Sequence, residues 1–147
     1  MKLVILVTLV AAALAGDTFK LTVKTKNVKY ANSNGYFYAT VIDYTGQEVN
    51  LGLMDNPKRN DFERGRTDVF TFKTNVSFKK IGCVMVRAGN KSSDAWMFDT
   101  MSISSTNDSG FSWSNPHNVW ISSDTSTTGD NGKLAMLWCA PPYPKLE

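Results

Sequence analysis

The stretch that decides the fold is NDFERGRTDVFTF, residues 60–72. Charged residues crowd around a single glycine, Gly65, which can mark a catalytic or metal site or the entry to a β-strand. After the glycine, Phe70 and Phe72 alternate with Val and Thr, which is typical of a half-buried strand, while glycine permits the turn before it. The pattern therefore predicts a turn and a strand entry, with both phenylalanines directed to a core and Phe62 packed beneath the loop.

We do not expect the carboxylates of this stretch to form a catalytic pair. Glu63 with Asp61 or Asp68 has the composition of a general acid and base. The adjacent Arg64 and Arg66 would hold such carboxylates ionised, which disfavours a general acid. Asp68 is instead expected to cap local backbone N–H groups or to pair with an arginine at the rim of the fold.

The rest of the chain repeats this alternation between turn-forming segments, and no helical period follows residue 16. Phe98 and Met101 differ in parity, which indicates a β-bulge or burial on both faces. About eight short strands in one domain predict a β-sandwich or barrel. Strands are expected at 19–25, 36–44, 48–54, 66–72, 79–88, 95–105, 111–114, 119–123 and 133–139.

The first 15 residues, MKLVILVTLVAAALA, have the pattern of a secretory signal peptide. Lys2 precedes an apolar run that is too short for a membrane span, and Ala13 and Ala15 form an A-x-A cleavage site. We therefore expect a secreted, extracellular domain over residues 16–140 with a proline-rich tail at 141–147, and no transmembrane segment.

The charge of the exported chain is nearly balanced. Without Lys2 it carries 15 basic and 13 acidic residues. This balance argues against nucleic acid as a partner and leaves a weak attraction to anionic membrane surfaces.

The chain has two cysteines, Cys83 and Cys139. An even number in an oxidising compartment favours a disulfide that ties the C-terminal segment to a central strand. The alternative is a pair of free thiols, one of them buried. A zinc site is disfavoured, because two cysteines and a single histidine, His117, do not make a zinc ligand set.

Two motifs together resemble the PLAT domain, the lipoxygenase-homology β-sandwich. The stretch FERGRTDVFTF is similar to the family pattern F-x-x-G-x-x-D-x-F, and AWMFDTMSIS is similar to the tryptophan strand that follows it. The resemblance spans roughly residues 18–139. The matching residues are Phe62, Gly65, Asp68 and Phe70 in the first motif, and Trp96, Asp99, Met101 and Ile103 in the second.

The resemblance implies an antiparallel sandwich of two four-stranded sheets that docks, without catalysis, onto a membrane, a lipid surface or a protein partner through loops at one end. We expect a monomeric, secreted single-domain module of this kind. Two alternatives stay open, an extracellular structural or matrix protein and a small hydrolase. The hydrolase is disfavoured because no G-x-S-x-G, H-E-x-x-H or phosphate-binding glycine motif occurs.

Some members of the family bind calcium at the docking loops. In this sequence Asn34 stands where the family has an aspartate, and the usual Asp-Asn pair falls on Ala88 and Gly89. Asn90 and Asp94 lie nearby but out of register. Calcium prefers several anionic oxygen ligands, so Asn34, Asn90 and Asp94 make only a weak site and no cofactor is firmly expected.

Docking to a membrane needs exposed aromatic side chains at loop tips. Tyr30 and Tyr36 flank the first long loop, and Phe111 and Trp113 lie in a segment rich in Ser, Gly and Asn. These four residues are the candidates for the membrane or partner site. The alternative for each is that it packs the end of the sandwich.

Three N-x-S/T sequons occur, at Asn75, Asn90 and Asn107. All three fall in predicted loops, which makes them acceptors for N-glycosylation if the chain is exported.

Overall fold

The computed structural model describes residues 16–89, 94–124 and 132–141. Within these ranges the chain forms ten strands and no helix. The strands are β1 (Thr18–Thr25), β2 (Phe37–Asp43), β3 (Glu48–Leu53), β4 (Thr67–Lys73), β5 (Ile81–Ala88), β6 (Phe98–Ser105), β7 (Phe111–Ser114), β8 (Trp120–Ile121), β9 (Gly132–Lys133) and β10 (Ala135–Cys139). The predicted signal peptide and most of the predicted tail lie outside the described residues.

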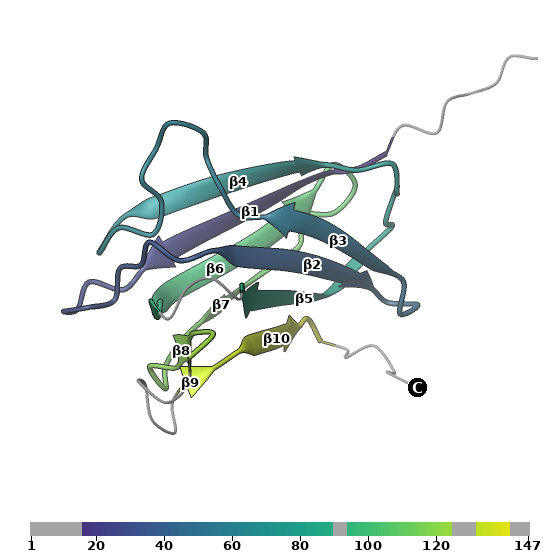
Figure 1. The fold of residues 1–147 in the computed structure, drawn as a ribbon. Helices are drawn as coiled ribbons and strands as arrows, with labels where there is room; N and C mark the ends of the chain where they lie inside the picture. The colour runs from purple at the N-terminus through teal and green to yellow at the C-terminus, as the bar shows by residue number, and fades with distance from the viewer. Residues whose placement is uncertain (1–15, 90–93, 125–131, 142–147) are drawn as a thin grey trace, which may run out of the picture.

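Two four-stranded antiparallel sheets face each other (Figure 1). One has the order β4-β1-β6-β7 and the other β10-β5-β2-β3. The short strands β8 and β9 pair in parallel as a small third sheet. The predicted all-β sandwich is confirmed, although the segment expected at 133–139 is divided between β9 and β10.

The core lies between the two sheets and follows the alternation of the strands. In β1, for example, Phe19, Leu21 and Val23 are fully buried. Phe70 is buried as predicted, whereas Phe72 is half-buried and packs at the margin of the core. The fully buried side chains include Trp96, Phe19, Phe37, Phe70, Phe78, Phe98, Leu21, Met54, Ile81, Met101, Ile103 and Ile121.

The predicted irregularity between Phe98 and Met101 is a register shift in the pairing of β1 with β6. Thr25 lies opposite Phe98 while Lys24 lies opposite Thr100, so Asp99 is the extra residue of a bulge. The bulge allows Phe98 and Met101 both to face the core despite their opposite parity.

Phe111 and Trp113 follow the alternative given for them, packing rather than exposure at a loop tip. Both lie on the edge strand β7, where a strand was predicted at 111–114, and both are half-buried against the core. The Trp113 ring stacks on Trp138 of β10, with 5.2 Å between the ring centroids, and closes the open side of the sandwich. Its Nε1 is buried with no hydrogen-bond partner among the described residues.

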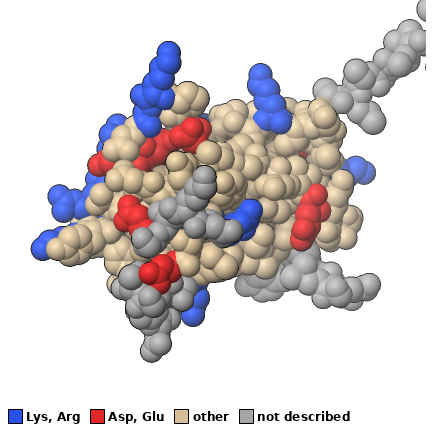
Figure 2. Space-filling model, in the orientation of Figure 1, with Lys and Arg blue, Asp and Glu red and all other residues tan. Residues whose placement is uncertain are grey.

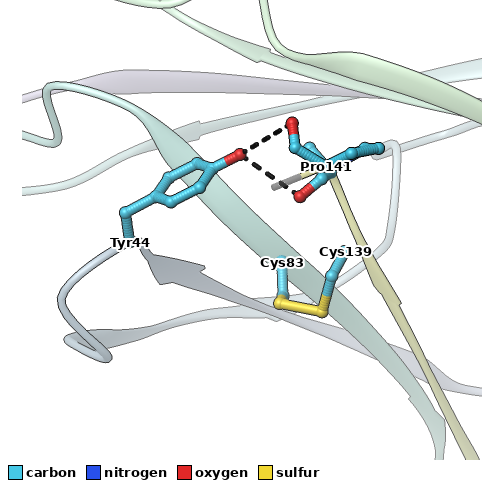
Figure 3. The surroundings of a disulfide bond; sticks show 5 residues. Tyr44, Cys83, Cys139 and Pro141 are labelled. Carbon is cyan, nitrogen blue, oxygen red and sulfur yellow. Dashed lines mark hydrogen bonds between the residues drawn. A yellow bond between two sulfur atoms is a disulfide. The ribbon is translucent and has the colours of Figure 1, made fainter. Parts of the chain in front are cut away.

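Cys83 and Cys139 form the predicted disulfide, which joins the neighbouring strands β5 and β10 (Figure 3). The two residues lie directly opposite each other in the strand pairing. Beyond the bridge, the Tyr44 hydroxyl donates to the carbonyl oxygens of Ala140 and Pro141, at 3.2 and 3.3 Å. The end of the described chain is therefore held to β5 by a covalent bond and to the β2–β3 turn by a polar contact.

Removing the bridge should destabilise the fold. The disulfide spans a sequence separation of 56 residues, and the chain-entropy model gives an upper figure of about 4 kcal/mol for a loop of this length. We expect the C83A/C139A variant to lose up to about that much free energy of unfolding in urea titrations. Intact mass of the unreduced, denatured protein should be two hydrogens below that of the reduced protein. Two free thiols would contradict the bridge.

Candidate functional site

One end of the sandwich carries long loops and the other carries short turns (Figure 1, left and right). The loops that follow β1 and β3 cover residues 26–36 and 54–66. The segments 94–97 and 115–119, before β6 and after β7, lie at the same end, as does Leu134 just before β10. We call this region the loop end. The turns after β2, β4 and β6 form the opposite end.

The signature stretch builds the loop end through one buried carboxylate. Asp68 is 1% exposed, and one of its oxygens accepts a hydrogen bond of 2.8 Å from the backbone N–H of Phe62. The other oxygen accepts from the Arg59 guanidinium at 2.8 Å. Asp68 thus fills both roles expected for it, the cap and the ion pair, inside the protein rather than at its rim.

The backbone bond to Asp68 fixes Phe62 beneath the loop. Phe62 has a positive φ of 59°, a backbone conformation that residues other than glycine rarely adopt. Its ring contacts Phe37, Trp96 and Phe70, with centroid distances of 5.0, 4.8 and 5.5 Å. The prediction that Phe62 packs under the loop is confirmed, and the loop is anchored by a side chain in the core.

The 26–36 loop is tied to its neighbours by backbone hydrogen bonds. The Ser33 N–H donates to the Phe62 carbonyl oxygen at 3.3 Å, and the Met97 N–H donates to that of Ala31 at 3.1 Å. The Lys26 ammonium donates to the side-chain oxygen of Asn118 in the 115–119 segment. These bonds connect the 26–36 loop to three neighbouring segments, 54–66, 94–97 and 115–119.

Backbone strain is concentrated at this end. Among the described residues, four that are not glycine have positive φ, and all four lie in loops of the loop end: Tyr30, Lys58, Phe62 and Asn118. In the turns of the opposite end, positive φ occurs only at glycines, Gly46 and Gly110. Strained positions of this kind cost of order 1–3 kcal/mol each and cluster at functional sites.

Exposed apolar side chains gather at the same end. Six large apolar residues of the described chain are exposed, and four belong to the loop end: Val28, Tyr30, Tyr36 and Leu134. Tyr30 is 71% exposed, and the Lys29 ammonium lies 4.7 Å from its ring centroid. Tyr36 and Leu134 flank the end of β5, through hydrogen bonds of their carbonyl oxygens with Gly89 and Ala88. Val28 and Leu134 were missed in the sequence, where single apolar residues in polar loops carry little signal.

The two long loops are also basic. The ranges 26–36 and 54–66 hold Lys26, Lys29, Lys58, Arg59, Arg64 and Arg66 against Asp55, Asp61 and Glu63. Lys and Arg side chains project from the left-hand end in Figure 2, beside carboxylates on the visible face. Asp61 is buried and accepts both the Asn56 backbone N–H and its side-chain amide, at 2.6 and 2.8 Å. These bonds fix the start of the 54–66 loop.

Two of the three calcium candidates, Asn34 and Asp94, come together at the loop end. A cleft of about 230 Å³ separates the two long loops and includes Asn34 in its wall. Asp94 uses its carboxylate to accept the Asn34 backbone N–H at 2.7 Å, while Asn90 lies outside the described residues. No group of three His, Cys, Asp or Glu side chains occurs in the described part of the chain. The donor set does not fit calcium, which prefers several carboxylate oxygens.

Two of the sequons lie at the opposite end. Asn75 follows β4 and Asn107 follows β6, and both are exposed. The Asn107 amide donates to Asp17 and Ser77, at 2.5 and 2.9 Å. Asn75 has no such side-chain bond to any described residue. Glycosylation stays a prediction, and glycans at these two positions would leave the loop end clear.

The fold and the motif geometry define a class, an all-β sandwich of two four-stranded sheets with long, hydrogen-bonded loops at one end. The chain matches the family model of the PLAT/LH2 domain over residues 19–134. It belongs to this family, whose domains are non-catalytic modules that bind membranes, lipids or proteins in related proteins. No curated protein matches the sequence.

Solved structures with the same fold include two bacterial toxins and an enzyme. The alpha toxin of Clostridium absonum aligns with a TM-score of 0.61 and 22% identity, over 77% of this chain and 31% of the toxin. The Clostridium perfringens alpha-toxin from an avian strain gives 0.61 and 24%, over 79% and 32%. Coral 8R-lipoxygenase, described as calcium-activated through a C2-like domain, gives 0.59 and 16%, over 83% and 16%. This chain therefore spans less than a third of each of these proteins.

None of the described residues forms a helix with the length and apolarity needed to cross a membrane.

The Asp68 network can be tested by D68A. The substitution leaves the buried Phe62 N–H without its acceptor and removes the shorter of the two ion pairs of Arg59, so we expect a loss of about 2–3 kcal/mol in the free energy of unfolding. D55A is the matched control, since Asp55 is an exposed carboxylate in the same loop and should cost less than about 0.5 kcal/mol. Equal urea midpoints for the two variants would contradict a central role for Asp68.

Proposed function

We propose that the protein is an exported, non-catalytic module that docks onto anionic membrane surfaces through its loop end. The observation that carries the proposal is Tyr30, which is 71% exposed with an ammonium group beside its ring, on a loop that is fixed to the core. Because the Tyr30 ring is mostly exposed, it contributes little to the packing of the protein's own core. It is well suited to the boundary between water and lipid, where an apolar ring with a polar tip is stable.

The surrounding residues support the same proposal. Val28 and Leu134 add apolar area that can leave water on contact with lipid. Basic side chains of the two long loops would each gain about 1 kcal/mol near an anionic leaflet. A structural or matrix role does not require exposed aromatics and basic residues at a single end.

The rigidity of the loop end lowers the cost of binding. Loops that must become ordered on contact lose conformational entropy that reduces affinity. Here the hydrogen bonds from Ser33 and Met97 and the buried ring of Phe62 already hold the surface in place. The family supplies the general role of docking, and the lipid as partner is our own inference.

Co-sedimentation with liposomes tests this function. We expect binding to vesicles with phosphatidylserine and much weaker binding to neutral phosphatidylcholine vesicles, with affinity falling as salt rises. Binding should be the same with calcium and with a chelator, because the described donor set does not fit the ion. Absence of binding to any composition would remove the membrane proposal, and a requirement for calcium would revive the metal site.

Substitution of the loop tyrosines and substitution of Trp113 should affect different properties, vesicle binding in the first case and stability in the second. Y30A/Y36A should lower partitioning onto anionic vesicles roughly tenfold to a hundredfold, because two exposed rings no longer enter the interface. Its unfolding midpoint should stay unchanged. W113A should instead cost about 2 kcal/mol of stability, because the ring is half-buried, and should leave the partitioning of the folded protein intact. The reverse result would restore β7 as the docking element.

A further inference from the structure

The outward face of the sheet β4-β1-β6-β7 has an unusual composition. Its thirteen regularly paired outward positions consist of nine hydroxyl side chains, three lysines and one valine, while Asp99, the bulge residue of β6, adds a carboxylate beside Lys24. They are Thr18, Lys20, Thr22 and Lys24 on β1, Thr67, Val69, Thr71 and Lys73 on β4, Thr100, Ser102 and Ser104 on β6, and Ser112 and Ser114 on β7. We call this surface the hydroxyl face.

Strand pairing arranges these groups in rows across the sheet. One row runs Thr67, Lys24, Thr100, Ser114, and the next runs Val69, Thr22, Ser102, Ser112. Neighbouring strands lie about 4.8 Å apart and successive outward residues about 6.7 Å apart. The face therefore presents a regular grid of hydroxyl groups, with the lysines of β1 and β4 set within it.

A hollow opens on this face toward the loop end. Its volume is about 550 Å³, and the outward side chains that line it come from all four strands: Thr22, Lys24, Thr67, Thr100, Ser102, Ser112 and Ser114. None of the hydroxyl groups in this lining makes a hydrogen bond to another described residue. They are available to a ligand, and each can both donate and accept a hydrogen bond.

Strand propensity does not account for the composition. Threonine is favoured in strands, but serine is not among the favoured residues, and four serines stand on this face. The outward face of the other sheet follows no such pattern, since it carries Glu48, Tyr38, Arg87, Met85 and Leu137. The two faces meet the same solvent, so exposure alone does not explain the hydroxyl face.

The hydroxyl face has a net positive charge, with three lysines against the carboxylate of Asp99. Lys24 pairs with Asp99 of the bulge at 3.4 Å, and both side chains are partly exposed, so the pair is weak. Lys20 and Lys73 have no carboxylate within ion-pair distance among the described residues. Such a surface repels a second copy of itself and attracts an anionic ligand.

We propose that the hydroxyl face binds an anionic polysaccharide. Ser and Thr hydroxyls would exchange hydrogen bonds with sugar hydroxyls in the hollow, while Lys20, Lys24 and Lys73 pair with carboxylate or sulfate groups along the glycan chain. The grid is four strands wide, about 14 Å from β4 to β7, so it offers an extended contact rather than a pocket for one sugar. This site is separate from the loop end and does not depend on membrane docking.

Direct binding measurements with defined glycans test the proposal. Polygalacturonate carries carboxylates, dextran sulfate carries sulfates, and plain dextran is the neutral control. We expect the protein to bind at least one of the two anionic glycans and not plain dextran, and the stronger of the two identifies the anion. Absence of binding to either anionic glycan would overturn the proposal.

Two variants separate the hydroxyl grid from simple charge attraction. K20Q/K73Q should weaken binding by about tenfold or more, while K79Q/K80Q, with the same charge change at the opposite end, should change it less than about twofold. T100V/S102A removes two hydroxyls without altering charge and should weaken binding several-fold. Equal losses in both lysine variants, or full affinity in T100V/S102A, would reduce the contact to non-specific attraction and refute the site.

The same variants keep this proposal distinct from the membrane proposal. T100V/S102A should bind anionic liposomes as well as the unmodified protein does, while Y30A/Y36A should keep its affinity for the glycan. Circular dichroism and urea midpoints that match the parent would show that each variant is folded. Loss of liposome binding in T100V/S102A would contradict two separate surfaces.

Discussion

A single buried carboxylate controls the geometry of the loop end. Asp68 lies almost fully out of water, where an ionised group is stable only when it is paired and hydrogen-bonded. Its two oxygens meet this demand through Phe62 and Arg59, which belong to the loop that precedes β4. The carboxylate therefore forces the loop to fold back over the core. With Phe62 held in its left-handed conformation, the ring closes the gap between the sheets, and the neighbouring 26–36 loop can bond to its carbonyl group.

The two ends of the sandwich cover the core between the sheets in different ways. At the opposite end, Asp17 is also buried and accepts the Phe78 backbone N–H at 2.6 Å, and the disulfide and Tyr44 hold the C-terminal strand nearby. Its turns use glycine where left-handed backbone is needed. At the loop end, residues with side chains take that conformation, and apolar groups stay in water. Among the described residues, positive φ at residues other than glycine occurs only at the loop end, and most of the exposed large apolar side chains lie there, which fits the docking surface that we propose.

Sequence alternation was sufficient to predict the sheets, because each strand has one buried face and a period of two. It was also sufficient to locate the bulge, since the parity change at Phe98 has few explanations. It predicted the strand at 111–114 but could not decide whether Phe111 and Trp113 are exposed or packed, because a short serine-rich edge strand and an exposed loop have similar sequences. The two roles of Asp68 were both foreseen as alternatives, but its burial was not, because burial depends on how the loop folds over it. The hydroxyl face could not be predicted from the sequence, because its rows combine residues from four strands and the register between those strands is known only from the structure.

The two proposed surfaces have a defined relation to each other. The loop end lies where β1 ends and β4 begins, so the strand axes run toward it, while the hydroxyl face lies parallel to those axes. A protein seated on a membrane by its loop end would hold the hydroxyl face upright, roughly normal to the bilayer. Lys24 and Thr67 would then lie nearest the lipid, and Lys20 and Lys73 farther out, in the zone where glycans project from a cell surface or an extracellular matrix. Simultaneous contact with lipid and glycan would raise the effective concentration of each site for its ligand, so that two weak contacts could hold the protein where a membrane and an anionic glycan meet.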